Sequence, residues 1–525
     1  MPKNYLIGIG GTGARVIESF VYLCAAGYGP DNDVTIFFID PDKANGNLER
    51  TTAVMDNYIR CRTNYAPAGK TNPLFKTKIS RPTDCVWNIF DQADMSLSKY
   101  ISYQTLKTRN RDFADLISLL YSGGHAASDD EHKGELGTKL NEGFRGHPSI
   151  GAVVMADAQR QQDQDPWKTL FSDISNATGE NDVRVFLVGS IFGGTGAAGV
   201  PTIGSRRLIK YSEQANLSNG RSKVFLGGSL VLPYFMFDMT GSNRETGLFV
   251  TPADFAVATK AALHYYSEKA LSGDLGFDQV YFIGDASRQS VGSFSAGTAT
   301  QKNNPHFIEM ATSLSVKDFF QQSLTRESSG KYFIASRTEG PFTWESFPMA
   351  ENTNTPVNQH QILKAHMLRM TIFAYSMCTY VKSQLESSTR DSWYKTYFDE
   401  KKKDTRIYNL HEQSNKLKVE SYTGFFNSFL RWICAINADT QSVKLIDSTK
   451  LLNGEEWYPA SPTSQNIAHL LPDKPVQGDF NNFISQLNNM PKADAPSTTI
   501  DAADRLLILF YNATNHFLNN FYRIN

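Results

Sequence analysis

Apolar residues in the first part of the chain fall into five short, nearly continuous runs, separated by stretches with helical spacing. The runs lie near residues 4–9, 34–39, 183–188, 223–231 and 279–283. Strands of a parallel sheet have this continuous pattern because helices cover both faces, whereas strands with one face in water alternate apolar and polar residues. The pattern therefore predicts an α/β fold whose parallel sheet has helices on both faces.

The pattern changes after about residue 330. Helical spacing appears at 358–388, 420–437 and 500–522, and the segments between are rich in Pro, Asn and Ser. KYFIAS at 331–336 and PFTWESF at 341–347 are predicted as short strands. We therefore expect two domains, residues 1–329 with an insertion at about 50–140, and a mostly helical domain at 330–525. A stripe in the last helix is predicted to pack on the core, and it consists of Leu506, Leu509, Phe510, Phe517 and Phe521.

Composition excludes several classes of protein. Apolar residues make up 41% of 525 residues, which is enough for more than one core, and the net charge of −1 gives no electrostatic footprint for nucleic acid or anionic lipid. No apolar stretch long enough to span a membrane lacks charges, and the first apolar run follows Met1 too closely for a signal peptide. We expect a cytoplasmic protein without direct membrane insertion. The five cysteines contain no C-x-x-C, so neither a disulfide framework nor a zinc site is predicted.

Two glycine-rich segments stand where an apolar run gives way to a helix. The first reads GIGGTGA at 8–14, and the second reads FGGTGAAGVP at 192–201. Glycines at such junctions permit positive φ and let an anion approach the N–H groups of the following helix, whose N-terminus carries partial positive charge. Two such turns predict a polyphosphate held from two sides. Nucleotide binding is therefore the leading hypothesis.

A NAD-dependent oxidoreductase is one alternative. Gly8, Gly10 and Gly13 form a G-x-G-x-x-G after a predicted strand, and the next apolar run ends in Asp40, as in dinucleotide-binding domains. That interpretation leaves the second turn unexplained, because such a domain holds its pyrophosphate with a single glycine turn. Neither turn contains the G-x-x-x-x-G-K-[ST] of an ordinary P-loop.

The second turn resembles the GGGTGTGAAP signature of the tubulin and FtsZ superfamily, with Phe192 for the first glycine and Ala197 and Ala198 for the second Thr-Gly. Five other segments of the first 330 residues resemble family segments in the same order. In the third of them Gly143, Gly146, Pro148 and Gly151 match, while Arg145 replaces a usual glycine. The five segments are GIGGTGA at 8–14, Asp40-Pro41-Asp42, EGFRGHPSIG at 142–151, SLVLPY at 229–234 and FDQVYFIGD at 277–285.

The resemblance implies a tubulin/FtsZ-like, Rossmann-type nucleotide-binding domain at 1–329 that binds GTP or GDP with Mg²⁺. Pro233 would reach the ribose, while Asp285 and Asn304 would lie near the base, because Gly284 stands where the family places its guanine-reading Asn. Asn304 is also predicted to cap the family's central helix, with Pro305 as its first residue. The phosphate and metal contacts implied are Gly10, Gly11, Thr12, Gly13, Asp40, Asp42, Gly143, Arg145, Gly146, Phe192, Gly193, Gly194, Thr195 and Gly196.

The family's hydrolytic acid comes from a loop after the central helix and completes the site of the neighbouring subunit. The segment at 342–354 stands in that place and offers Glu345 and Glu351, although it lacks the family motif. Either residue is a candidate to activate or orient the attacking water. The resemblance thus implies a Mg²⁺-dependent GTPase that assembles head to tail into filaments, with protein partners at its C-terminal domain. A non-hydrolysing GTP-binding switch or scaffold is the other alternative.

Overall fold

The structure of the protein is a computed structural model. It describes residues 2–65, 74–88, 90, 94–121, 134–144, 146–157, 163–177, 181–215, 223–238, 252–286, 289–293, 299–325, 330–336, 340–349, 358–399, 401, 403–438, 443–452, 467–471, 478–497 and 500–523.

An eight-stranded sheet forms the centre of the α/β part. Its order is β10-β8-β6-β5-β1-β2-β3, with β4 also paired to β2, and every pairing is parallel. The five predicted strands are confirmed as β1, β2, β5, β6 and β8. The strands are β1 Lys3–Ile9, β2 Val34–Ile39, β3 Ile79–Ser80, β4 Val86–Trp87, β5 Val183–Ser190, β6 Val224–Val231, β8 Gln279–Ile283 and β10 Lys331–Ala335. A separate two-stranded sheet pairs β7 (Phe235–Asp238) with β9 (Gln289–Ser293).

The strand order reverses at β1. The strand pairs with β2 on one side and with β5 on the other, so the loops after β1 and β5 leave the same edge of the sheet side by side. In open parallel sheets, ligands bind at the carboxyl ends of the strands at such a reversal.

Helices cover both faces of the sheet, which confirms the predicted α/β class. One face packs against α1 (Gly10–Ala25), α2 (Gly46–Asn64) and α11 (Phe307–Gln321), and Leu6, Phe38 and Phe186 point into that core. Ile7, Phe37 and Leu187 point into the core on the other face. The helices there are α6 Pro148–Asp157, α7 Trp167–Ser175, α8 Gly194–Pro201, α9 Lys210–Ala215 and α10 Pro252–Leu271.

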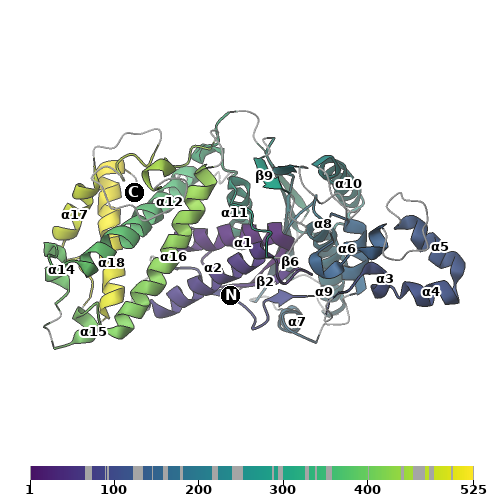
Figure 1. Ribbon diagram of the computed structural model, residues 1–525, viewed down its shortest axis with the longest axis horizontal. Coiled ribbons are helices and arrows are strands. Elements are labelled where there is room, and N and C mark those ends of the chain that lie inside the picture. The colour runs from purple at the N-terminus through teal and green to yellow at the C-terminus, as the bar shows by residue number, and fades with distance from the viewer. Residues whose placement is uncertain are drawn as a thin grey trace.

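The segment expected as an insertion from about residue 50 begins within α2, which is one of the helices that cover the sheet. Three short helices later in that segment lie at the end of the molecule opposite the C-terminal helices (Figure 1). They are α3 Leu97–Tyr100, α4 Tyr103–Arg109 and α5 Arg111–Leu120.

The C-terminal part is helical at the three predicted places. Its longest helices are α12 (Gln359–Ser376), α16 (Gln413–Ala438) and α18 (Ala502–Phe517), and α12 and α18 each run into a π-helical turn. The predicted packing of the last helix is confirmed, because Leu506, Leu509, Phe510 and Phe517 are fully buried and Phe521 is partly buried. Shorter helices complete this part, namely α13 Lys382–Glu386, α14 Ser392–Tyr397, α15 Thr405–Tyr408 and α17 Phe480–Asn488.

One predicted strand is wrong. KYFIAS forms β10, at the edge of the main sheet, but PFTWESF forms the 3₁₀ helix η7 (Trp344–Ser346). A capping box between Thr343 and Ser346 stabilises the helical turn, and the buried Trp344 indole donates to the carbonyl oxygen of Leu445 at 2.8 Å. Because β10 belongs to the main sheet, the sheet extends past the boundary expected at residue 330.

The C-terminal helices share a core with the sheet. The ring of Tyr22, on α1, lies 5.7, 5.7 and 5.0 Å from the rings of Phe425, Phe429 and Trp432 on α16. The same apolar cluster continues from α1 and α2 into α12, α16 and α18. None of the helices within the described ranges has the length and apolar character needed to cross a membrane.

Candidate functional site

A cavity of about 280 Å³ lies at the carboxyl ends of β1, β2 and β5, at the reversal of strand order. It is lined by Ile9, Gly10, Gly11, Thr12, Arg15, Asp40, Asp42, Asn45, Asn47, Glu142, Gly143, Phe144, Gly146, Ser190, Phe192, Gly193, Gly194, Thr195, Gly196, Phe235, Phe255, Thr300, Gln301, Lys302 and Asn303.

The first glycine turn joins β1 directly to α1. Gly10 has φ +72°, a conformation that side-chain-bearing residues rarely adopt, and the helix has no side-chain cap at its N-terminus. Its first-turn residues Gly11 and Thr12 line the cavity, while Gly13 does not. A β-carbon on Gly13 would lie 2.5 Å from the carbonyl oxygen of Val188, so this glycine lets α1 pack closely on β5.

The second glycine turn presents another uncapped helix to the same cavity. α8 begins at Gly194, and Gly193 at its N-cap makes no side-chain cap. A β-carbon on Gly196 would lie 2.6 Å from the carbonyl oxygen of Ser190, which explains the need for glycine in this tight turn. A β-carbon on Gly10 would lie 3.2 Å from Cβ of Thr195. The two turns are therefore in contact, and two helix N-termini that no described side chain caps converge there.

The third predicted phosphate loop lies against the start of α8. Gly143 and Gly146 have φ of +92° and +78°, and a β-carbon on Gly194 would lie 2.9 Å from the backbone nitrogen of Gly146. Phe144, buried between them, anchors the loop. Arg145, predicted in this loop, lies outside the described residues.

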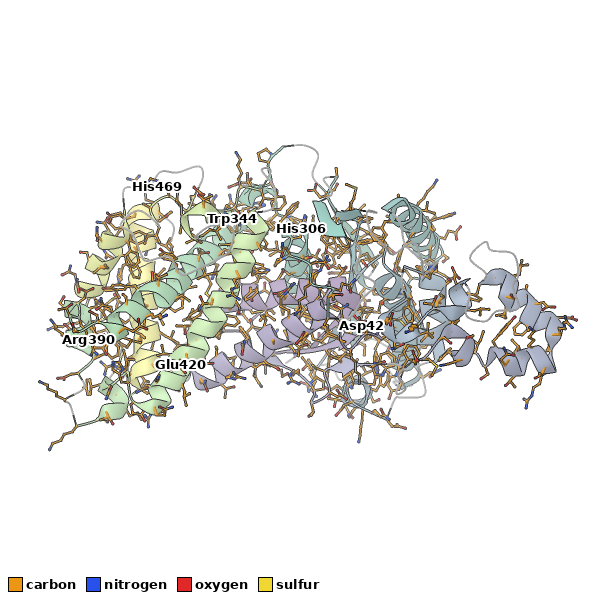
Figure 2. The ribbon with its side chains drawn as sticks, viewed as in Figure 1. Asp42, His306, Trp344, Arg390, Glu420 and His469 are labelled. Carbon is orange, nitrogen blue, oxygen red and sulfur yellow. The ribbon has the colours of Figure 1, made fainter. Side chains whose placement is uncertain are left out.

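Two predicted carboxylates stand in the loop between β2 and α2, where Figure 2 labels Asp42. Asp40 is only 4% exposed, and its Oδ1 accepts the N–H of Asp42 at 3.0 Å. Burial raises the pKa of Asp40 to about 7; the hydrogen bond from Asp42 opposes this rise, and the Asp42 charge adds to it. A cation in the cavity would favour the ionised form of Asp40.

These carboxylates fit the requirements of Mg²⁺ bound to a phosphate. Mg²⁺ usually keeps several waters and is held by one or two carboxylates together with substrate phosphate oxygens. Among the described residues, no group of three or more His, Cys, Asp and Glu side chains could hold a metal ion by itself. Asp40 and Asp42 would therefore be the protein's contribution to a shared coordination sphere.

The residues predicted near the sugar and base do not line the cavity. Pro233, Asp285 and Asn304 lie outside its lining. Of the four described phenylalanines that line it, three lie close together, with ring centroids 4.8 Å apart for Phe192 and Phe255 and 5.5 Å apart for Phe192 and Phe235. Such rings offer a stacking surface for a planar group.

The predicted start of the central helix is wrong by two residues. α11 begins at Phe307 with His306 as its N-cap, rather than at Pro305 with Asn304 as N-cap. The Nδ1 of His306 accepts the N–H of Ile308 at 3.2 Å, and Oε2 of Glu309 accepts the N–H of His306 at 3.0 Å. This capping box satisfies the helix start without Asn304. Burial lowers the pKa of His306 to about 3, so the ring is neutral, as its acceptor role requires.

A buried ionic group that the sequence analysis missed adjoins the cavity. Arg15, in the second turn of α1, contacts Oε1 of Glu309 through Nε at 3.1 Å and donates from Nη2 to the hydroxyl of Tyr234 at 2.5 Å. The Tyr234 hydroxyl in turn donates to Oε1 of Glu309 at 2.6 Å. The sign of this group in the sequence was a single basic residue, Arg15, two positions after the last glycine of GTGAR.

Two further lining segments were also missed. Asn45 and Asn47 begin α2, and 300–303 precede α11. The two segments are 256 residues apart in sequence and bond to each other through side-chain amides. The asparagines of ANGN, just after Asp42, were the only local sign of the first segment.

The candidate catalytic acid Glu345 is not among the described residues that line the cavity. Glu345 lies in η7 and accepts from the Thr343 hydroxyl at 3.0 Å, and Glu351 lies outside the described residues. Burial would raise the pKa of Glu345, but hydrogen bonds from its own N–H and Thr343, together with Lys364 and His360, lower it. Glu345 is therefore ionised at neutral pH and lies elsewhere on the same chain.

The fold and the cavity define an α/β protein with a Rossmann-like parallel sheet and a candidate anion site at its strand reversal. No protein-family model matches the chain, and no curated protein matches it.

Proposed function

We propose that this protein binds GTP with Mg²⁺ as a tubulin/FtsZ-like nucleotide-binding protein. The observation that carries the proposal is the contact between two glycine turns on adjacent strands, which brings two uncapped helix N-termini to one cavity. A dinucleotide-binding domain needs one such turn for its pyrophosphate, whereas two turns suit a longer phosphate chain.

The proposal is also supported by the other predicted segments that line the same cavity. Residues from 8–14, 40–42, 142–151 and 192–201, four of the six segments that carry the resemblance, line the same cavity. The two segments that the resemblance assigns to sugar and base do not. The choice of guanine therefore rests on the resemblance, and the phosphate end of the site is the better supported part.

The chemistry follows from the groups that face the cavity. Backbone N–H groups of the first turns of α1 and α8 would bind phosphate oxygens, and Asp40 and Asp42 would hold the metal. Bound Mg²⁺ would offset phosphate charge during transfer to water. These backbone N–H donors belong to the starts of helices. They therefore need no rearrangement when negative charge develops on the phosphate oxygens in the transition state.

Hydrolysis would require a second subunit. Glu345 does not line the cavity of its own chain, so under this proposal it acts on the nucleotide of a neighbour. A contact in which one surface of each subunit meets a different surface of the next is heterologous and generates filaments when it does not close. The proposed activity is therefore a Mg²⁺-dependent GTPase coupled to head-to-tail assembly.

The decisive experiment identifies the nucleotide and its turnover. Purified protein is denatured, any released nucleotide is identified, and native protein is then incubated with GTP and Mg²⁺ over a series of protein concentrations while phosphate is followed. Released guanine nucleotide, with turnover that rises more than linearly with concentration, is the expected result. Bound guanine nucleotide without turnover would favour the switch or scaffold, and NAD binding or no nucleotide would reject the proposal.

A further inference from the structure

Residues 299–303, here named the latch segment, lie across the N-terminus of α2. The Nδ2 of Asn45 donates to the side-chain oxygen of Gln301. Asn47 and Asn303 exchange two hydrogen bonds, Nδ2 of Asn47 to Oδ1 of Asn303 at 3.1 Å and the N–H of Asn303 to Oδ1 of Asn47 at 2.9 Å. Arg50 adds a third anchor by donating to the carbonyl oxygen of Asn303 at 2.8 Å.

These anchors place the latch segment beside the first glycine turn. A β-carbon on Gly11 would lie 3.6 Å from Nδ2 of Asn47 and 3.7 Å from the side-chain amide of Asn45. Arg50 is itself held by two hydrogen bonds to the carboxylate of Glu18, on α1. The position of the segment is therefore fixed relative to α1 as well as to α2.

The side chain of Lys302 lies flat on the backbone of Gly46. A β-carbon on Gly46 would lie 2.6 Å from Cγ and 2.8 Å from Cε of Lys302. The lysine Nζ is 3.8 Å from Oε2 of Glu49, and the two side chains are 56% and 69% exposed. An exposed pair at this separation is weak, so a multiply charged anion in the cavity would compete successfully for the ammonium group.

The charges around the cavity make Lys302 the suitable partner for an anion. The described lining residues include three carboxylates, Asp40, Asp42 and Glu142, and two cations, Arg15 and Lys302. Arg15 is held by Glu309 in a pair whose side chains are 3% and 1% exposed. Lys302 has a flexible stem and an exposed head, so it can reach a ligand without breaking a buried interaction.

We propose that Lys302 binds a phosphate group of the nucleotide and that the latch segment positions it there. The inference rests on the proposed nucleotide function and adds a phosphate contact to it. The ligand class is a nucleoside di- or triphosphate, since the ammonium group would bind the phosphate charge and would not distinguish one base from another. The amide pair of Asn47 and Asn303 is a positioning element that holds Lys302 at the cavity.

The test compares Lys302→Gln with Lys43→Gln in the full-length protein. Lys43 is an exposed lysine in the loop before α2 that does not line the cavity, so its loss removes the same charge nearby. Equilibrium dissociation constants for GTP and GDP are measured by calorimetry at several salt concentrations. We expect Lys302→Gln to weaken GTP binding about tenfold and to flatten its salt dependence, and Lys43→Gln to change affinity less than twofold.

Two further variants separate a charge contact from a packing role. Lys302→Arg should restore most of the affinity, whereas Gly46→Ala should weaken binding because its methyl group would lie 2.6 Å from both the Ala299 carbonyl oxygen and Cγ of Lys302, so the latch segment and the lysine stem must shift. Affinity and salt dependence of Lys302→Gln equal to those of Lys43→Gln would overturn the inference while leaving the nucleotide function intact. An equal loss in Lys302→Arg and Lys302→Gln would also overturn it. No nucleotide binding by the unaltered protein would instead reject the proposed function.

Discussion

Nε of Arg15 lies 3.1 Å from Oε1 of Glu309, and this buried ion pair joins α1 to α11 beside the cavity. Its side chains are 3% and 1% exposed, so neither charge can be satisfied by water if the other is lost. The Tyr234 hydroxyl bonds to both partners and completes the group. The start of α11 is thereby tied to the helix that follows the first glycine turn.

Glu309→Ala should lower the free energy of unfolding by about 3–5 kcal/mol, because it leaves the Arg15 guanidinium buried and uncompensated. Urea denaturation measures the change. Glu420→Ala is the matched control, since Glu420 forms an exposed pair with Lys416 and its loss should cost less than about 1 kcal/mol. Similar small effects for both variants would contradict a structural role for the buried pair.

The contribution of Asp40 to the stability of the ligand-free protein should fall as pH rises from about 4 to about 7. The folded pKa of Asp40 is raised from 3.8 to about 7, so the folded state holds its proton more tightly, and this stabilising contribution is lost as pH rises through the folded pKa. The full effect is on the order of 4 kcal/mol. Asp40→Asn should remove this part of the pH dependence in urea titrations at pH 4 and pH 8. An unchanged slope in the variant would exclude Asp40 as its source.

Binding of Mg²⁺ with GTP near pH 7 should release protons from Asp40. A carboxyl group with a pKa of about 7 is half protonated at that pH, and a metal ligand must be deprotonated. Calorimetry in two buffers of different ionisation enthalpy measures the proton count. Asp40→Asn should bind more weakly and without this release. Equal proton release by the variant would assign it to another group.

Gly194→Ala should weaken GTP binding at least tenfold. Its methyl group would lie 2.9 Å from the backbone nitrogen of Gly146 and from Cβ of Phe144, so the third loop must move away from the start of α8. Gly424→Ala on α16 is the control, because a β-carbon there meets nothing within 4 Å and should add about 0.5–1 kcal/mol of stability. Full affinity in Gly194→Ala would show that the phosphate site does not use this junction.

Glu345→Gln should abolish GTP turnover while preserving nucleotide binding, since the residue is not among those that line the cavity of its own chain. If Glu345 acts on a neighbour, then at a GTP concentration too low to occupy Gly194→Ala, a mixture of Glu345→Gln with Gly194→Ala should regain turnover that neither variant shows alone. Phosphate release from the two separate variants and from their mixture measures this. Normal turnover in Glu345→Gln alone would exclude it as the catalytic acid.

The elements found from the sequence are those whose structural cause is local. Strands β1, β2, β5, β6 and β8 have helices on both faces, which forces continuous apolar runs into the sequence. The glycine turns were found because Gly10, Gly143 and Gly146 adopt positive φ, and because Gly196 leaves no room for a side chain. Each of these requirements restricts residue type at its own position.

What could not be predicted depends on contacts between distant residues. The bonds between Asn47 and Asn303 join positions 256 residues apart and impose no periodic pattern on either segment. The Trp344 indole likewise bonds to the carbonyl oxygen of the distant Leu445, although the capping box of Thr343 and Ser346 is local. The helix start at His306 was different, because the three-residue spacing to Glu309 was visible in the sequence but Asn304-Pro305 offered a more familiar signal.

Helix α1 runs from the cavity to the aromatic rings of the C-terminal helices. Its first residues face the cavity, fourteen of its sixteen residues are buried, and Tyr22 near its far end lies among the aromatic rings of α16. At 1.5 Å per residue the helix is about 24 Å long, and a packed helix moves as a rigid body. An axial displacement of α1 at the glycine turn would therefore also shift Tyr22 against the aromatic rings of α16.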